Sequence, residues 1–399
     1  MNDEKRCIDC ENTCAIFVLY DETGMIDEYV YYLLRELKTV SKRIIIVSNS
    51  NIDTKSYEKL KNITEEIILR ENRGFDAEAY RTIILNYLSE AEIKQYDKII
   101  FCNDTFYGPF ISFKEIFEVM EAKDSDFWGL HFWDLEMIKG VTSSLLVFNK
   151  RITNENLLIE FFKQMLEVRN YNEAVINYEH SIFEFLVKKG MTYALYCEQV
   201  NIDVYRNAYH TVKEFGLPSM KRKCLNRKNY DKKIIMSTLK YIDENTDYPI
   251  ELIIDSAREK YYIELRLEDV RNYKIENEIE QTIKLYRGKI KEKTQIEAFM
   301  DMFSNVYLYT EGHYTQVFLM KFPEYSDKIK GIIVSDGYKN NESFYGYKIF
   351  EYSEFLENKN DNCGIIVTTR LYNEYGLKKI LGNSENVLYL WDDVSSNKR

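Results

Sequence analysis

The sequence is poor in proline and glycine, with 4 and 15 of these residues among 399. Disordered and fibrous chains are usually rich in both, so the composition disfavours those classes. Hydrophobic residues make up 45% of the chain, and 33 tyrosines and 22 phenylalanines are among them. A sizeable core is therefore available, and the length allows two or three domains at roughly 100–200 residues each.

The sequence also lacks any apolar run that approaches the ~20 residues of a membrane-spanning helix. Its first residues, MNDEKRCIDCENTC, contain no hydrophobic stretch typical of a secretory signal. Cys102 and Cys197 lie in apolar runs, as reduced thiols of the cytoplasm do. Cys7, Cys10 and Cys14 lie close together but have no fourth ligand nearby to complete a metal site. We therefore expect a cytoplasmic protein.

Basic residues are fewer than acidic ones, with 54 Lys and Arg against 65 Asp and Glu, so the net charge is −11. Proteins that bind nucleic acid are usually basic, so no nucleic-acid partner is expected. The stretch MKRKCLNRKNYDKK, residues 220–233, is a local exception. It either attaches the protein peripherally to the inner face of the cell membrane or forms an ordinary solvated surface.

The first part of the chain alternates between apolar segments and segments with helical spacing. Val30, Leu33, Leu34 and Leu37 lie on one stripe of a helix expected at 25–40. Short apolar segments, of the kind that parallel sheets bury, occur at 14–20, 43–50, 65–71 and 96–104. This alternation predicts a parallel sheet with helices on both faces.

Polar residues follow each of these four segments. They are Tyr20 and Asp21, Ser48 and Asn49, Asn72 to Gly74, and Asn103 and Asp104. Ligands of parallel α/β sheets bind beyond the carboxyl ends of the strands. The four strand ends are therefore a candidate binding edge, although loops are polar in general.

The segment ENRGFDAEAYR, residues 71–81, leads into a helix expected at 77–88. Gly74 permits a positive φ or a close approach of the backbone to a ligand. Asn72 and Asp76 can hydrogen-bond to a ligand, but Asp76 can equally be the N-cap of the helix. Arg73 can meet a phosphate or lie in solvent. The segment is thus a candidate ligand-binding loop as well as an ordinary turn.

Three further segments contain candidate site residues. Asp104 ends the segment YDKIIFCND, where it can hold a divalent cation together with substrate phosphates or cap a turn. Trp128, in a strand expected at 125–133, can stack on a sugar ring or pack in the core. Glu179 lies at the start of an expected helix, where a carboxylate is favoured. It can serve as a general base that stays ionised, or have no chemical role.

The composition changes towards the second half of the chain. Residues from about 250 to 300 are highly charged and lack proline, which predicts a helical connector at 249–300. Residues 301–399 alternate again and predict a smaller Rossmann-like α/β domain. Thr310, Gly312 and Thr315 stand where the dinucleotide fingerprint requires three glycines. We therefore expect no NAD in this domain, and a docking or structural role for it.

Several motifs together resemble a known family, the rhamnan-synthesis protein F family. They are, in order, ELKTVSKRIIIVSNS, ENRGFDAEAYR, YDKIIFCNDTFYGPF, SDFWGL, YEHSIFEFLVKKGM and GLPSMKR. The resemblance covers about residues 14–225. That family is similar to glycosyltransferases of the GT-A fold that build bacterial surface polysaccharides. The resemblance implies an α/β fold, with a GT-A-like, Rossmann-type nucleotide-sugar domain at 1–248.

The resemblance also implies roles for the residues that match the motifs. The residues implied to line the nucleotide pocket or to contact the nucleoside and ribose are Tyr20, Asp21, Ser48, Asn49, Asn72, Gly74 and Asp76. Glu179 matches the general base of inverting members. Lys221 and Arg222 would hold the diphosphate or an anionic acceptor.

The D-x-D motif of GT-A enzymes, which binds metal and diphosphate, is altered in this chain. Asn103 and Thr105 replace its two acids and leave Asp104 as the one carboxylate for Mg²⁺ or Mn²⁺. The implied activity is transfer of a sugar, such as rhamnose, from a nucleotide-diphosphate sugar to a lipid-linked or polysaccharide acceptor. The alternative is an inactive GT-A-like scaffold or nucleotide-sugar-binding protein. A nucleotidyltransferase is disfavoured, because LYDETGM has no glycine- and lysine-rich phosphate loop.

Overall fold

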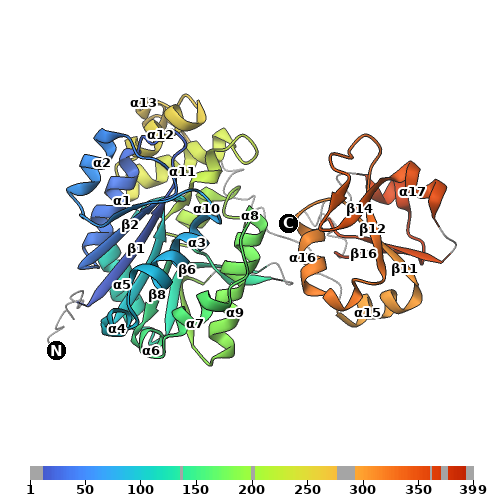
Figure 1. Ribbon diagram of the computed structural model, residues 1–399. Coiled ribbons are helices and arrows are strands. Elements are labelled where there is room, and N and C mark those ends of the chain that lie inside the picture. Colours follow the sequence, from blue (N-terminus) through green and yellow to red (C-terminus); the bar gives the residue numbers. More distant parts are fainter. Residues whose placement is uncertain are drawn as a thin grey trace. The chain divides into compact units, whose positions relative to one another are not determined.

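A computed structural model describes residues 12–134, 138–198, 203–275, 293–359, 362–369 and 376–391. The chain divides into two compact units, residues 1–134 with 139–286 and residues 287–399 with 135–138. Each unit contains its own sheet with helices packed around it (Figure 1). The predicted α/β class is therefore confirmed for both units. None of the described helices is long and apolar enough to cross a membrane.

The sheet of the first unit has the strand order β3-β2-β1-β4-β8-β6-β7, with β9 beside β6. The strands are β1 (Thr13–Leu19), β2 (Arg43–Ser48), β3 (Ile67–Leu69), β4 (Lys98–Asn103), β6 (Phe127–Asp134), β7 (Lys139–Val141), β8 (Leu145–Asn149) and β9 (Tyr193–Cys197). A separate antiparallel pair joins β5 (Phe106–Tyr107) to β10 (Met220–Lys221).

The sheet is buried on both faces, which explains why its central strand β1 is apolar from Cys14 to Leu19. Along β1, Phe17 and Leu19 belong to one hydrophobic core, and Ile16 and Val18 belong to a second core on the opposite face. Side chains alternate between the faces of a strand, so a strand covered on both sides is apolar over most of its length. Helices on both faces of the sheet are therefore confirmed.

The helices of this unit are short and match the predicted segments approximately. They are α1 (Glu28–Lys38), α2 (Thr54–Lys61), α3 (Phe75–Thr82), α4 (Glu90–Gln95), α5 (Phe113–Glu121), α6 (Lys150–Asn154), α7 (Leu157–Gln164), α8 (Tyr171–Glu173), α9 (Ser181–Lys188), α10 (Ala208–Lys213), α11 (Lys232–Asn245), α12 (Glu251–Tyr261) and α13 (Leu267–Arg271). Two π-helical segments, η1 (Ile83–Tyr87) and η2 (Ala174–His180), continue α3 and α8, and a 3-10 turn, η3 (Arg222–Leu225), follows β10.

The prediction of a parallel sheet is correct for β3, β2, β1 and β4, and β6 and β9 also pair in parallel, but it is wrong for β7 and β8. Strand β8 runs antiparallel to both β4 and β6, and β7 runs antiparallel to β6. Residues between β6 and β8 are too few for the crossover helix that parallel neighbours require, so the chain reverses direction. As a consequence, the link 142–144 before β8 lies at the carboxyl end of β4.

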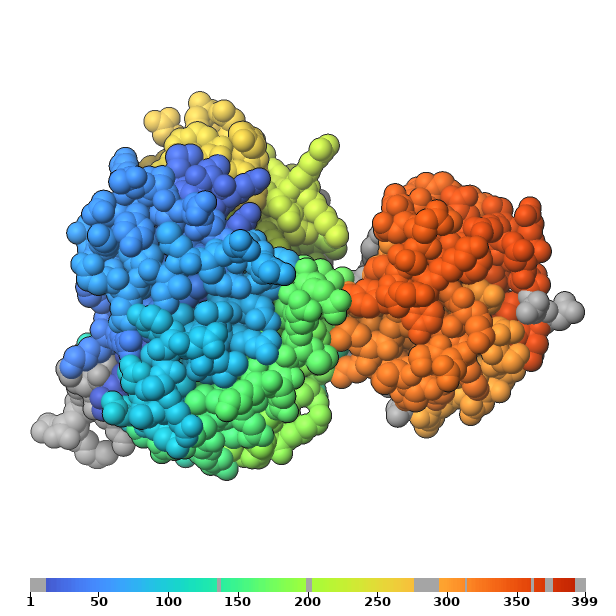
Figure 2. All heavy atoms as spheres, in the orientation of Figure 1, coloured from blue at the N-terminus to red at the C-terminus, as the bar shows by residue number. Residues whose placement is uncertain are grey.

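The predicted connector at 249–300 is partly a component of the first unit. Ile253, Ala257, Leu265 and Val270, from α12, α13 and the loop between them, are buried in the same core as α1. In Figure 2 the gold surface of α12 and α13 lies directly beside the blue surface of the N-terminal region. Apolar side chains at helical spacing thus place 251–271 in the first unit. Residues 276–292 lie outside the described residues.

The second unit has a Rossmann-like sheet with the order β13-β14-β12-β11-β15-β16. Its strands are β11 (Asn305–Tyr309), β12 (Ile329–Val334), β13 (Ser343–Phe344), β14 (Tyr347–Glu351), β15 (Cys363–Val367) and β16 (Val387–Tyr389). Its helices are α15 (Lys293–Met302), α16 (His313–Lys321), η4 (Pro323–Tyr325), α17 (Tyr352–Asn358) and α18 (Leu377–Leu381). All neighbours from β14 to β16 are parallel. Thr310 adopts φ 92°, a conformation that disfavours a β-branched residue.

Candidate active site

The candidate site lies where the strand order of the first sheet reverses. From β1 the chain proceeds to β2 and β3 on one side, and β4 then pairs with β1 on the other. Open α/β sheets bind ligands at such a switch point, outside the carboxyl ends of the strands. The amide N–H of Tyr20, after β1, donates to Oδ2 of Asp104, after β4, at 3.4 Å. Asp104 therefore lies between the carboxyl ends of the two strands.

Gly74 directs the chain from β3 into α3. It adopts φ 75°, a left-handed conformation, and a Cβ there would lie 2.1 Å from Cγ of Glu78. The permissive backbone predicted for Gly74 is therefore present, and it serves the turn. The alternative of an N-cap at Asp76 is wrong, because Gly74 is the cap and α3 begins at Phe75. Asp76 instead lies in the first turn, where the helix dipole favours a carboxylate.

Asp76 and Asn103 are joined across the edge of the sheet. Nδ2 of Asn103 donates to Oδ2 of Asp76 at 2.9 Å and lies 3.2 Å from the carbonyl oxygen of Ser143. Oδ1 of Asn103 accepts the hydroxyl of Thr105 at 2.6 Å. The Asn103 amide is thus fully engaged in holding its neighbours in place.

Ser143 connects Asp76 with Glu179. Its hydroxyl donates to Oε1 of Glu179 and lies 3.4 Å from Oδ2 of Asp76. Ser143 lies in the link 142–144, which the reversal of β8 brings to the carboxyl end of β4. Two carboxylates that are far apart in the sequence therefore flank one hydroxyl group.

Glu179 lies inside a helical run and not at a helix start, so that part of its prediction is wrong. Segments α8, η2 and α9 follow one another without a break from 171 to 188, and Glu179 lies near the end of η2. A Cβ at Gly140 would lie 2.9 Å from the carbonyl oxygen of Glu179, so only glycine lets β7 pack so closely. Nδ1 of His180 also lies 2.9 Å from the carbonyl oxygen of Lys139. Packing on β7, and not a helix N-terminus, thus positions Glu179.

Burial changes the proton affinity of both carboxyl groups. It raises the pKa of Asp76, which the hydrogen bond from Asn103 lowers in part. It likewise raises the pKa of Glu179, which the hydrogen bond from Ser143 lowers in part. Burial lowers the pKa of Lys221, and the nearby Glu179 carboxylate opposes this effect. The cluster therefore combines two acids of raised pKa with a nearby amine of lowered pKa, an arrangement typical of functional sites.

Asp104 forms an ion pair with Arg222. Nη1 of Arg222 lies 3.0 Å from Oδ2 of Asp104. Burial raises the pKa of Asp104 to about 6, although Arg222 favours its charged form. The pair β5–β10 places Arg222 here, because Lys221 pairs with Phe106 and the Arg222 amide donates to the carbonyl of Thr105 at 2.9 Å.

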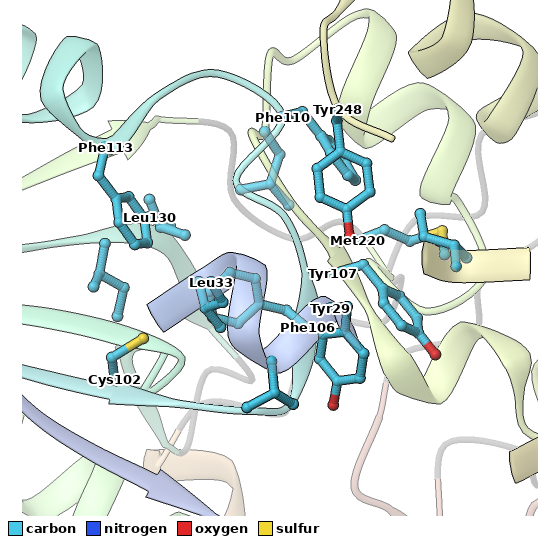
Figure 3. Close-up of a cluster of buried hydrophobic side chains, with 14 of the residues drawn as sticks. Tyr29, Leu33, Cys102, Phe106, Tyr107, Phe110, Phe113, Leu130, Met220 and Tyr248 are labelled. Atoms are coloured by element: carbon cyan, nitrogen blue, oxygen red, sulfur yellow. The ribbon is translucent and has the colours of Figure 1, made fainter. Parts of the chain in front are cut away.

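A cluster of buried hydrophobic side chains packs beside the Asp104–Arg222 ion pair. Tyr29, Tyr107 and Met220 lie together in it (Figure 3), and the rings of Tyr29 and Tyr107 are 4.8 Å apart. The Tyr29 hydroxyl donates to the carbonyl oxygen of Asp104 at 2.9 Å, and the Arg222 guanidinium lies 5.5 Å from the centre of the Tyr29 ring. The backbone of Asp104 and the side chain of Arg222 are therefore fixed by the same buried tyrosine.

The family model of rhamnan synthesis protein F matches residues 44–310. The chain belongs to the rhamnan synthesis protein F family. Membership links it to the synthesis of a polysaccharide, and the suspected resemblance is confirmed. The match begins at residue 44, later than the 14 expected, and extends past the expected end at 225 to include α12, α13 and β11. It contains Asp76, Asp104, Ser143 and Glu179, but Tyr20 precedes it. None of the curated proteins compared with the chain matches it.

Within this family member, the residues expected to line a nucleotide pocket lie along the carboxyl edge of β1 and β2. Asp21 is paired with Lys260 of α12, whose Nζ lies 2.6 Å from Oδ2. Asn49 is buried, donates to the carbonyl oxygen of Phe75 at 3.0 Å and accepts a hydrogen bond from Arg70 at 2.5 Å.

The remaining residues of this edge differ in exposure. Ser48 is buried and donates to the carbonyl oxygen of Ser50 at 2.7 Å, whereas Tyr20 is exposed. Asn72 and Arg73 are also exposed, and the structure does not bring them into the cluster around Asp76. Their contact with a ligand stays a prediction.

Trp128 does not lie in the site, and the prediction that its ring contacts a sugar is wrong. The side chain is 2% exposed and packs in the core against Phe117, with ring centres 4.8 Å apart. A ring this deeply buried offers no face to a ligand. The alternative named above, core packing, is the one the structure shows.

The oxygen atoms of Asp104 and its neighbours are not arranged as ligands of a divalent cation. Oδ2 of Asp104 already accepts from Arg222 and from Tyr20, and Asn103 and Thr105 are hydrogen-bonded to each other. Within the described ranges, no group of three His, Cys, Asp or Glu side chains could hold a metal ion. Mg²⁺ and Mn²⁺ prefer oxygen ligands free of a competing cation.

Sequence reasoning missed Ser143, Arg70 and Lys260. Ser143 belongs to a short polar link with no motif of its own, and it faces Glu179 only because β8 reverses direction. Lys260 was assigned to a connector, although its helix packs against α1. Of these three residues, only the place of Lys260 could have been predicted from the sequence. Ile253, Ile254 and Ala257 give α12 an apolar stripe, which is typical of a helix that packs against a core.

Proposed function

We propose that the first unit transfers a sugar, such as rhamnose, from a nucleotide-diphosphate sugar to a growing bacterial surface polysaccharide, with inversion at the anomeric carbon. The observation that supports this proposal is the cluster of Asp76, Ser143 and Glu179 beside Lys221 and Arg222 at the switch point of the sheet. Membership of the rhamnan synthesis protein F family agrees with it.

In the proposed reaction Glu179 is the general base. Its carboxylate takes the proton of the acceptor hydroxyl as the acceptor oxygen bonds to the anomeric carbon. The bond from that carbon to the diphosphate oxygen breaks, and the nucleoside diphosphate leaves with the electron pair. A carboxylate whose pKa is raised by burial accepts a proton more readily than an exposed one, which suits this role.

Asp76 and Ser143 support the base. The Ser143 hydroxyl fixes the orientation of the Glu179 carboxylate, and the Asn103–Asp76 hydrogen bond fixes the region next to it. Polar side chains at the ends of β1 and β2, Asn49 among them, would contact the nucleoside. Asp104 acts through Arg222, to which it is paired.

The test is sugar transfer with a panel of radiolabelled nucleotide-diphosphate sugars and lipid-linked acceptors. Glu179→Gln should lower the rate by about 10²- to 10⁴-fold, the usual contribution of a general base. The matched control is Glu184→Gln, a partly exposed residue on the following helix, which should transfer at the normal rate. Full activity of Glu179→Gln would exclude Glu179 as the base.

The same panel separates the enzyme from the alternative of an inactive scaffold. Binding of every nucleotide sugar is measured by calorimetry before transfer is assayed. A protein that binds none of them would be a scaffold of an assembly complex. A protein that binds one of them without transferring its sugar to any acceptor would be a nucleotide-sugar-binding protein.

A further inference from the structure

The Asp104 carboxylate is paired with an arginine that belongs to the fold. Arg222 follows β10, and its amide N–H donates to the carbonyl oxygen of Thr105 at 2.9 Å, immediately after Asp104. Nη1 lies 3.0 Å from Oδ2 and 3.3 Å from the carbonyl oxygen of Asp104. These contacts fix a positive charge next to the carboxyl ends of β1 and β4.

Arg222 still has donors that the protein does not use. A guanidinium group has five N–H donors. Within the described parts of the chain, Arg222 Nη1 bonds to Asp104, and Arg222 Nε is buried without a hydrogen-bond partner. A buried donor without a partner is costly. The Arg222 side chain is 20% exposed, so a ligand oxygen can reach the guanidinium group.

Lys221 is a second cation near Asp104. It is partly exposed, and its Nζ lies 3.5 Å from the hydroxyl of Thr105, at the limit of a hydrogen bond. The acidic groups that act on it most strongly are Glu179 and Asp76. Two adjacent cations thus stand beside the carboxylate cluster, on the side of Asp104.

We propose that this chain needs no divalent cation at Asp104, because Arg222 and Lys221, the residues expected above to hold the diphosphate, supply the positive charge in its place. The proposal rests on the proposed function and names the group that neutralises its leaving diphosphate. An arginine fork matches phosphate oxygens geometrically, and a lysine adds a point charge. As the bond to the anomeric carbon breaks, the negative charge that develops on the diphosphate is stabilised by these two fixed cations. Asp104 is then a positioning residue that orients Arg222.

The experiment is calorimetry of the full chain with UDP, dTDP, GDP, CDP and ADP, each in EDTA and again in MgCl₂ or MnCl₂. We expect one of these nucleotides to bind with an affinity that EDTA leaves unchanged. Arg222→Gln should weaken that binding by about 10- to 100-fold, the usual cost of losing a charged hydrogen bond. Lys221→Gln should weaken it less, and Arg227→Gln, an exposed residue of the same basic stretch, should leave it unchanged.

Asp104→Asn distinguishes the two roles of Asp104. If Asp104 positions Arg222, the variant keeps most of its nucleotide affinity in EDTA, because asparagine can still accept from the arginine. If Asp104 is a metal ligand, binding depends on the metal and is lost in the variant, which would overturn the proposal. The double variant Asp104→Asn, Arg222→Gln has no charge at either position of the pair and should bind as weakly as Arg222→Gln alone.

The two proposals fail in different ways. Binding that requires Mg²⁺ or Mn²⁺ contradicts the inference on Arg222 and leaves the glycosyltransferase intact. Binding of none of the five nucleotides, with or without metal, contradicts both.

Discussion

The Ser143 hydroxyl donates a hydrogen bond to the Glu179 carboxylate and lies 3.4 Å from Oδ2 of Asp76. Ser143 precedes β8 and Glu179 is in η2. The two residues are far apart in the sequence, so the sequence around either of them does not predict the contact. A hydroxyl has one proton, and here it stabilises the charged form of Glu179. The balance between burial and this hydrogen bond decides the pH at which Glu179 can act as a base.

The first prediction is that Ser143→Ala moves the pH dependence of sugar transfer. Burial raises the pKa of Glu179 and the Ser143 hydrogen bond lowers it, so removal of the hydroxyl raises the pKa further. A base must be deprotonated, and activity should therefore rise with pH and reach half its maximum at a higher pH in the variant. The measurement is kcat/KM against pH for both proteins.

Ser144→Ala is the control for this experiment, because the Ser144 hydroxyl bonds to Thr142 and not to Glu179. It should give the wild-type profile. An unchanged midpoint in Ser143→Ala would show that the pKa of Glu179 does not govern the reaction.

The second prediction concerns stability and Asp104. Its pKa rises on folding, from an ordinary 3.8 to about 6, because the carboxyl group is buried. A raised folded pKa means that the native state binds the proton more tightly, so this contribution to stability is present below about pH 4 and is lost as the pH rises to about 6. Asp104→Asn removes the titration, and its free energy of unfolding should fall less than that of the wild type over this range.

Urea denaturation at a series of pH values measures this difference. The difference between the two proteins should stop changing above about pH 7, one unit above the folded pKa, where Asp104 is charged in both the folded and the unfolded state. A constant difference from pH 4 to 6 would show that Asp104 does not titrate there.

The third prediction is that Trp128 serves stability and not sugar binding. Trp128→Ala should lower the free energy of unfolding by about 3–5 kcal/mol, since it leaves a cavity in the core beside Phe117. At a temperature where the variant stays folded, its affinity for nucleotide sugars should equal that of the wild type. If the variant had normal stability but a weaker affinity for nucleotide sugars, Trp128 would have to be counted among the sugar-binding residues.

The fourth prediction tests whether α12 belongs to the first unit. Lys260 lies 2.6 Å from Asp21 and 3.5 Å from Asp27, and its side chain is 17% exposed. Lys260→Gln leaves two carboxylates without their cation and should destabilise the unit by about 1–3 kcal/mol. Thermal unfolding measures the loss. Arg258→Gln, on the exposed side of the same helix, should cost well under 1 kcal/mol.

The central strands and the helices that cover them could be predicted from the sequence. In β1 the run from Cys14 to Leu19 is apolar because both of its faces are buried, and that pattern depends on local residue types alone. The same holds for the stripe of α1. The direction of β8 could not be predicted, because an apolar segment of that length pairs equally well in either direction.

The candidate site was predictable only as a set of strand ends. Asn103 and Asp104 follow one apolar segment and Asp76 follows another, and the carboxyl ends of parallel strands lie at the same edge of a sheet, so the edge on which they lie follows from the pattern. Their partners do not follow from it. Arg222 reaches Asp104 through the pairing of β10 with β5, a contact between residues more than a hundred positions apart.

The sequence by itself determined the two α/β units, the polar edge of the first sheet and the family to which the chain belongs, because these depend on local periodicity and on motifs in fixed order. Only the tertiary structure decided that Trp128 is a core residue, that Ser143 joins two carboxylates and that an arginine is paired with Asp104. The reason is physical: burial and ion pairing are set by which distant segments pack together, and a single segment contains no information on its partner.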